Sequence, residues 1–166
     1  MLLAPDGVTA QPAALLAAQL QLRLLAWSIP AEQDPALTLA ALAQEAPGWL
    51  LPLPLDPGAD LALPGCWADA LAAWRQPALL LLPAAAANGG LPRAYHALLA
   101  MAGVPLLGLL QWGLPWSAEP RRRDGLPWLG CLAAGDQSPA LADDPAAMAW
   151  PLLLRRRWAA LQRSQA

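Results

Sequence analysis

Residues 78–111, ALLLLPAAAANGGLPRAYHALLAMAGVPLLGLLQ, decide the fold of this chain. The run Ala78–Leu82 is apolar throughout, which is typical of a strand buried on both faces of a parallel sheet. A turn at Asn88–Gly90 leads into Leu91–Ala102, a helical pattern that the following glycine ends. Val104–Gln111 is again apolar and predicts the next strand. The stretch therefore predicts a strand–helix–strand unit with a right-handed crossover.

The same alternation extends along the rest of the chain. Short apolar runs predict further strands at residues 2–4, 22–29, 49–55 and 126–132. Segments rich in alanine and leucine predict helices at residues 12–20, 35–45, 66–74, 143–149 and 152–162. Pro52 and Pro54 make residues 49–55 an edge strand or an irregular one. The order predicts one α/β domain over residues 1–166, with a mostly parallel sheet flanked by helices in three layers.

Two other architectures compete with this prediction. An all-helical fold is favoured by the abundance of alanine and leucine and by the scarcity of β-branched residues. A membrane span is suggested by Ala94–Ala118, 25 residues without a charge, followed by three arginines. Glycines and prolines interrupt that segment, and we therefore expect a helix, a turn and a buried strand there.

Composition excludes several kinds of site. Of the 166 residues 57% are hydrophobic, enough to bury a core, and all ten cationic side chains are arginine, so no lysine can serve a phosphate loop or a Schiff base. One histidine and two isolated cysteines, Cys66 and Cys131, exclude a zinc site of the usual spacing and a disulfide framework. We expect reduced thiols in a cytoplasmic protein, because residues 1–7 also lack the basic start of a secretory signal.

Charge and aromatic content bear on the partners. The net charge is −2, and the arginine triplets 121–123 and 155–157 are the only cationic clusters. We expect these triplets to solubilise an apolar domain and expect no nucleic-acid partner. Nine tryptophans and no phenylalanine predict tryptophans in the core and at a homodimer contact.

Four segments stand out together: WADALAAWRQ through GVPLLGLL (67–110), GLPWLG (125–130), AWSIP (26–30) and PGADLALP (57–64). In chain order they resemble dethiobiotin synthetase, a member of the P-loop NTPase class. The resemblance implies a P-loop-like α/β fold and a cytoplasmic, dimeric enzyme of biotin biosynthesis. Such an enzyme uses ATP and Mg²⁺ to close a carboxylated diamine into a ureido ring.

The resemblance also assigns a degenerate phosphate loop. It implies nucleotide contacts at Gly7, Val8, Thr9, Gln11 and Trp128. In this loop an alanine stands where the family has its lysine, Gln11 stands in place of a serine or threonine, and further along Ser28 replaces a second lysine. Phosphoryl transfer depends on such cations, and the sequence therefore predicts impaired or lost catalysis.

The remaining candidates are polar residues near predicted strand ends. Asp56 and Asp60 flank a Pro-Gly turn and could hold Mg²⁺ at the sheet edge, although turn formation is the simpler role. Asn88, Gly89 and Gly90 could approach a phosphate closely or form a plain turn.

His96 is the one imidazole that could act as a base, or it is a helix boundary residue. Two functions stay open: an ATP-dependent ligase of the dethiobiotin synthetase type, and a non-catalytic homologue that acts as a binding or assembly module.

Overall fold

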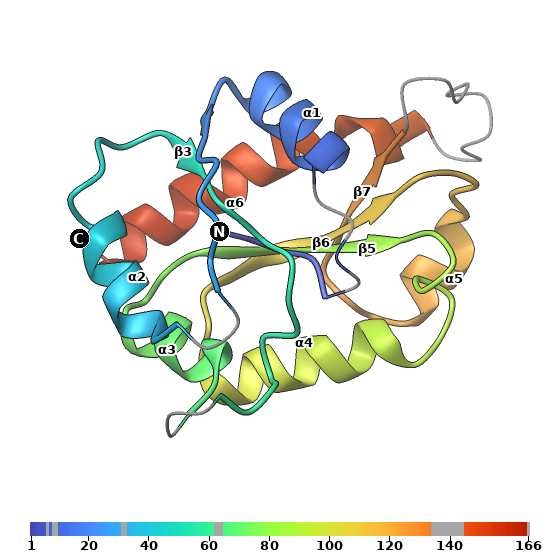
Figure 1. The fold of residues 1–166 in the computed structure, drawn as a ribbon. Coiled ribbons are helices and arrows are strands. Elements are labelled where there is room, and N and C mark those ends of the chain that lie inside the picture. The colour runs from blue at the N-terminus through green and yellow to red at the C-terminus, as the bar shows by residue number, and fades with distance from the viewer. Residues whose placement is uncertain (6, 8–9, 31–32, 62–64, 134–144, 166) are drawn as a thin grey trace.

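The fold is built on a parallel sheet with helices on both faces (Figure 1). A computed structural model describes residues 1–5, 7, 10–30, 33–61, 65–133 and 145–165. Its main sheet has five strands in the order β4-β1-β5-β6-β7, and every neighbouring pair is parallel. The strands are β1 (Leu2–Leu3), β4 (Pro52–Leu53), β5 (Ala78–Pro83), β6 (Leu106–Trp112) and β7 (Trp128–Leu132). The α/β prediction is confirmed.

A short ladder continues the sheet beyond β4. Here β2 (Arg23–Leu24) pairs in parallel with β3 (Trp49–Leu50), and only Leu51 separates β3 from β4. Residues 49–53 therefore contact β2 with one half and β1 with the other, giving the line β2, β3/β4, β1, β5, β6, β7. The predicted irregular strand at 49–55 is confirmed, because Pro52 lies in the edge strand of the main sheet.

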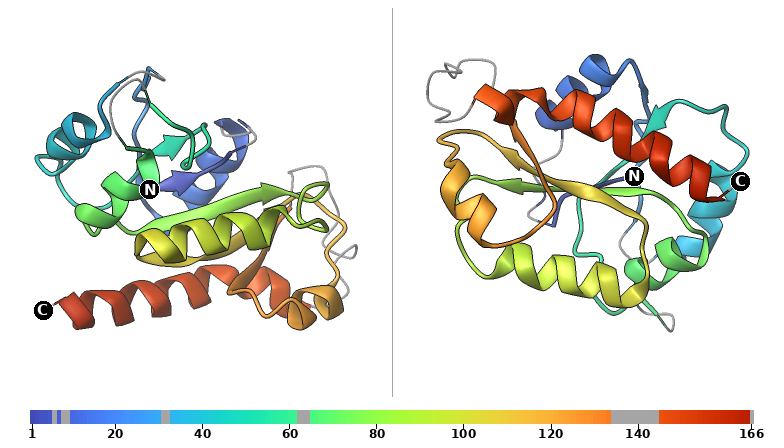
Figure 2. Two further views of the ribbon diagram at one scale, coloured as in Figure 1. Left: turned by 90° about the horizontal axis from the view of Figure 1, so that it is seen from below. Right: turned by 180° about the vertical axis from the view of Figure 1, so that it is seen from behind.

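Strand alternation divides the core between the two faces of the sheet. Leu80 and Leu82 of β5 pack with residues of α2, α3 and α4, whereas Leu79 and Leu81 pack with α1 and α6. Figure 2 shows α4 and α6 on opposite sides of the sheet. The helices are α1 (Ala10–Leu20), α2 (Pro35–Leu42), α3 (Trp67–Ala73), α4 (Leu91–Ala102), α5 (Ala118–Arg123) and α6 (Trp150–Gln165), with a 3₁₀ turn η2 at Pro145–Ala149. The three-layer arrangement follows from this two-sided core.

The structure departs from the sequence prediction at one strand and one helix, and it does not bear out the membrane alternative. The strand predicted at 22–29 is reduced to Arg23–Leu24, and both residues are exposed, because only β3 pairs with it. The helix α5 was not predicted, although its Pro120 lies in the first turn, where a missing N–H is tolerated. The membrane alternative at Ala94–Ala118 fails because the segment divides between α4 and β6. Among the described residues, no helix combines the length and the apolar character needed to cross a bilayer.

Close backbone packing joins the last elements to the sheet. A Cβ at Gly130 (φ +148°) would overlap the Ala147 backbone of η2. Arg157 of α6 donates from Nη1 to two main-chain carbonyls, that of Leu107 in β6 (2.8 Å) and that of Pro127 just before β7 (2.9 Å). Burial lowers the pKa of Arg157, but the guanidinium stays a cation and binds α6 to the strand ends.

Candidate functional site

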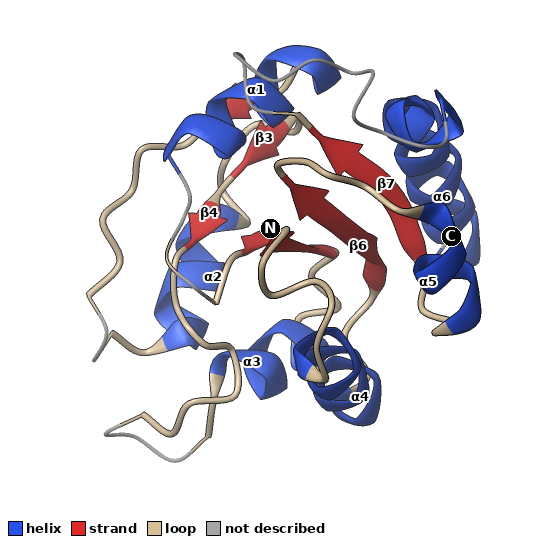
Figure 3. Ribbon diagram, turned by 90° about the vertical axis from the view of Figure 1, so that its right-hand side faces the viewer, coloured by secondary structure: helices blue, strands red, loops and turns tan. Residues whose placement is uncertain are grey.

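The carboxyl ends of the strands form the edge at which open α/β sheets bind ligands. From β1 the chain crosses toward β4, and from β5 it crosses toward β6 and β7, so the crossovers diverge between β1 and β5. Figure 3 looks at the side of the molecule where these ends and α5 lie. Loops after β1 and β5 carry Gly7 and Asn88, two residues that the sequence singled out.

The loop after β1 is a turn at its described positions. Gly7 has φ +75°, is exposed, and donates its N–H to the carbonyl of Ala4 (2.9 Å). Val8 and Thr9 lie outside the described residues, and Gln11 is exposed in the first turn of α1. The N–H of Gly7 is therefore occupied by the protein itself.

The loop after β5 is tied to α5 by a side-chain hydrogen bond. Asn88 Oδ1 accepts from Arg121 Nη2 at 2.9 Å. Gly89 and Gly90 are exposed, and Gly90 is the N-cap residue before α4, with ordinary right-handed torsion angles and no side-chain cap. Neither glycine uses a positive φ, so the turn interpretation describes their geometry.

Arg121 is the centre of a polar cluster that the sequence did not reveal. Its Nη2 also donates to the buried Gln111 Oε1 at 2.8 Å, and its guanidinium carbon lies 4.7 Å from the ring centre of Trp128 and 5.6 Å from that of Trp116. The side chain is 6% exposed, and its Nε has no hydrogen-bond partner. Burial lowers the pKa of Arg121, while the charge of Asp124 opposes that shift.

This cluster contains a buried cation that acts through hydrogen bonds and ring contacts, while the charge of Asp124 reaches it without a direct ion pair. Among the described residues, no carboxylate forms an ion pair with Arg121. Amide oxygens and indole faces stabilise it instead. The expectation that both arginine triplets only solubilise the surface is therefore wrong for Arg121, and also for Arg157, which bonds to main-chain carbonyls.

Trp128 is enclosed by the same cluster. Its Nε1 donates to Asp124 Oδ2 (2.8 Å), and its ring meets Trp116 edge to face at 6.0 Å between centroids. The guanidinium of Arg121 lies over the face of this ring. A nucleotide base could stack on that face only if Arg121 moved away.

Among the described residues, no hydrogen bond links the other candidate residues to Asn88 or Trp128. Asp56 Oδ1 accepts from the N–H of Gly58 (2.9 Å), which is the geometry of an Asx turn. Asp60 and Ser28 are exposed, and His96 lies half-buried in the middle of α4. Within the described ranges, no three acidic, histidine or cysteine side chains gather as metal ligands.

The described residues do not fit a catalytic ATP–Mg²⁺ site. Phosphates are normally cradled by free main-chain N–H groups and a lysine, with a hydroxyl and a carboxylate for the metal. Here the Gly7 N–H is occupied, Asp56 completes a turn and the chain has no lysine.

Comparisons with protein-family models, with curated proteins and with solved structures found no match to this chain. The fold and the edge described above define the class as a parallel α/β protein of three layers.

Proposed function

We propose that this chain is a dethiobiotin-synthetase-like α/β protein that keeps the ligand-binding edge of its sheet without catalysis, and so acts as a non-catalytic binding module. One observation carries the proposal: Gly7 and Asn88 follow β1 and β5, the two strands between which the crossovers diverge. A small-molecule ligand at this edge would meet the turn at Gly7 and the uncapped start of α4.

The chemistry of the edge supports binding over turnover. The cation that lies there, Arg121, already donates to Asn88 and Gln111 and is 6% exposed. Removing preorganised positive charge from a phosphoryl-transfer site costs several kcal/mol of barrier. All ten cationic side chains of the chain are arginines, so no lysine can take the place of the missing one.

An active ligase of the dethiobiotin synthetase type is the second candidate, because the strand order leaves the β1–α1 loop at the diverging crossovers. Isothermal calorimetry with ATP and Mg²⁺, together with release of ADP in the presence of a carboxylated diamine and bicarbonate, separates the two. Saturable nucleotide binding without ADP release supports the binding module. ADP release that depends on the diamine establishes the ligase, and no binding at millimolar nucleotide rejects both.

A pair of glycine variants locates the nucleotide if it binds. Gly7 and Gly125 both have a positive φ, +75° and +69°, and a Cβ at either would meet nothing within 4 Å. Gly7→Ala and Gly125→Ala therefore carry similar backbone strain at different places. We expect only Gly7→Ala to weaken nucleotide binding.

We also propose that the protein is a cytoplasmic homodimer. Large apolar side chains on its surface support self-association, with exposed fractions of 66% for Leu37, 88% for Met101 and 66% for Leu152. The two free thiols, Cys66 and Cys131, support a reducing compartment. Sedimentation equilibrium measures the oligomeric state, and a monomer at all concentrations would reject the dimer.

A further inference from the structure

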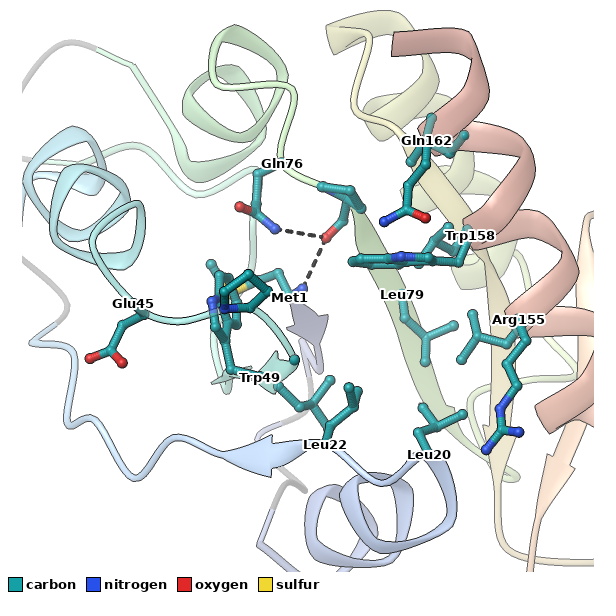
Figure 4. Close-up of a pocket in the computed structure, with 17 residues that line it drawn as sticks. Met1, Leu20, Leu22, Glu45, Trp49, Gln76, Leu79, Arg155, Trp158 and Gln162 are labelled. Atoms are coloured by element: carbon teal, nitrogen blue, oxygen red, sulfur yellow. Dashed lines mark hydrogen bonds between the residues drawn. The ribbon is translucent and has the colours of Figure 1, made fainter. Parts of the chain in front are cut away.

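A half-open cleft of about 520 Å³ lies at the amino edge of the sheet, opposite the candidate nucleotide edge (Figure 4). Leu79 of β5 and Leu107 of β6 line it. Figure 4 shows Trp158 of α6 across the cleft from Leu20 and Leu22. Its size is within the range of about 300–1,000 Å³ that is typical of small-molecule sites. The apolar lining favours a ligand with an apolar body.

The charges around the cleft select among such ligands. Glu45 is neutralised by Arg23, whose Nη2 lies 2.7 Å from its Oε2. The Met1 amine donates to the Pro77 carbonyl (2.9 Å), and burial lowers its pKa to about 5, so it is uncharged at pH 7. Arg155 is the lining cation that stays uncompensated, because no described carboxylate pairs with it.

The Arg155 side chain is exposed to solvent, and the protein itself supplies few partners for its guanidinium. Its one described hydrogen bond is a long contact of 3.4 Å from Nη2 to the Gln19 carbonyl. Figure 4 shows this guanidinium beside Leu20, while the carboxamides of Gln76 and Gln162 lie at the far end of the cleft. Mostly apolar side chains line the cleft between these two polar ends.

We propose that this cleft binds a free medium-chain carboxylic acid, with its alkyl chain against Trp158 and the sheet and its carboxylate on Arg155. A carboxylate accepts two parallel N–H bonds from a guanidinium, which replaces the weak contact to Gln19. Each methylene buried against the apolar lining raises affinity by roughly fourfold. An alkylammonium would meet Arg155 as a like charge, and a neutral alcohol would leave it without a counter-ion.

The experiment titrates decanoate into the full chain by isothermal calorimetry at pH 7.5, below the micelle concentration, with decanol as the uncharged ligand. Arg155→Gln removes the proposed partner, and Arg156→Gln removes its neighbour, which is exposed like Arg155 but does not line the cleft. Trp158→Ala opens the apolar wall, and Trp74→Ala is its control, since the two indoles are 41% and 45% exposed but only Trp158 lines the cleft. Circular dichroism verifies that each variant is folded.

Saturable binding of decanoate is expected, and Arg155→Gln should weaken it by roughly tenfold or more because a charge-assisted bond is lost. Decanol should bind less tightly and should not respond to Arg155→Gln, whereas Trp158→Ala should weaken both ligands. Arg156→Gln and Trp74→Ala should change neither.

Absence of saturable decanoate binding overturns the proposal, as does an equal effect of Arg155→Gln and Arg156→Gln. The proposal is also overturned if the protein is a dimer that Trp158→Ala abolishes but decanoate leaves intact. The cleft is then a contact between two copies of this chain. Nucleotide titrations at the carboxyl edge are unaffected by any of these outcomes, so the test is independent of the proposed function.

Discussion

Replacing Arg121 tests whether the cluster around it stabilises the carboxyl edge. Arg121→Ala removes two hydrogen bonds, of 2.9 Å to Asn88 and 2.8 Å to Gln111, and the contacts with two indole rings. It also leaves the oxygen of Gln111, a fully buried residue, without this donor. An orphaned buried acceptor costs about 1–3 kcal/mol and an indole–cation contact about 1 kcal/mol. Relief of the buried charge offsets part of this loss, and we expect a net destabilisation of about 3 kcal/mol.

Urea unfolding followed by circular dichroism measures this change. Arg123→Ala is the control, because that side chain is 78% exposed and forms a surface ion pair with Glu119 on the same helix (2.9 Å), so its loss should cost less than about 0.5 kcal/mol. Asn88→Ala and the double variant Arg121→Ala/Asn88→Ala complete a mutant cycle. We expect a coupling energy of about 1 kcal/mol between Arg121 and Asn88.

Two results would refute this reasoning. If Arg121→Ala unfolds within 0.5 kcal/mol of the wild type, the cluster does not hold the edge together. If Arg121→Met is more stable than the wild type, desolvation of the guanidinium outweighs its hydrogen bonds. The cation would then be retained at a cost in stability, which favours a role in ligand binding.

Other predictions concern titration, thiol exposure and close packing. Burial lowers the pKa of the Met1 amine from 8.0 to about 5, so between these pH values the unfolded chain binds one proton more than the folded chain. The free energy of unfolding should therefore rise by up to about 4 kcal/mol from pH 5 to pH 8, and a flat pH profile would contradict this. A thiol reagent should modify the half-exposed Cys66 before the buried Cys131, whose pKa burial raises to about 11, and equal rates in the native protein would contradict the burial. Gly130→Ala should prevent folding or lower the free energy of unfolding by more than about 3 kcal/mol, since its Cβ has no room. Gly90→Ala should be nearly neutral because the space there is open, and the midpoints of urea unfolding measure both effects.

The central strands could be predicted because their leucines are buried on both faces. Ala78–Leu82 and Val104–Gln111 carry no polar residue before Gln111, and the structure places β5 and β6 in the middle of the sheet. Residues 22–29 are also largely apolar, but Arg23 and Ser28 interrupt the run, and only two of its residues find a strand partner, beyond the edge of the main sheet. Hydrophobicity does not show how many neighbouring strands a segment obtains, so the length of the paired part could not be predicted from it.

Part of the carboxyl edge could be predicted and its centre could not. Asn88 and Trp128 were selected separately, and in the structure both contact Arg121. Arg121 belongs to a run of three arginines, and such a run is ordinarily a solvated surface. A predicted helix at 118–123 was the missing signal, because its 3.6-residue period directs one arginine inward while its neighbours stay exposed.

The helical period also changes what either triplet offers to a polyanion. In α6, Arg157 is committed to main-chain carbonyls, Arg155 lines the amino-edge cleft, and Arg156 is exposed next to them. In α5 the first arginine is buried under indoles. Consecutive like charges in the printed sequence are thus dispersed over separate directions in space, and a long phosphate backbone would meet them one or two at a time.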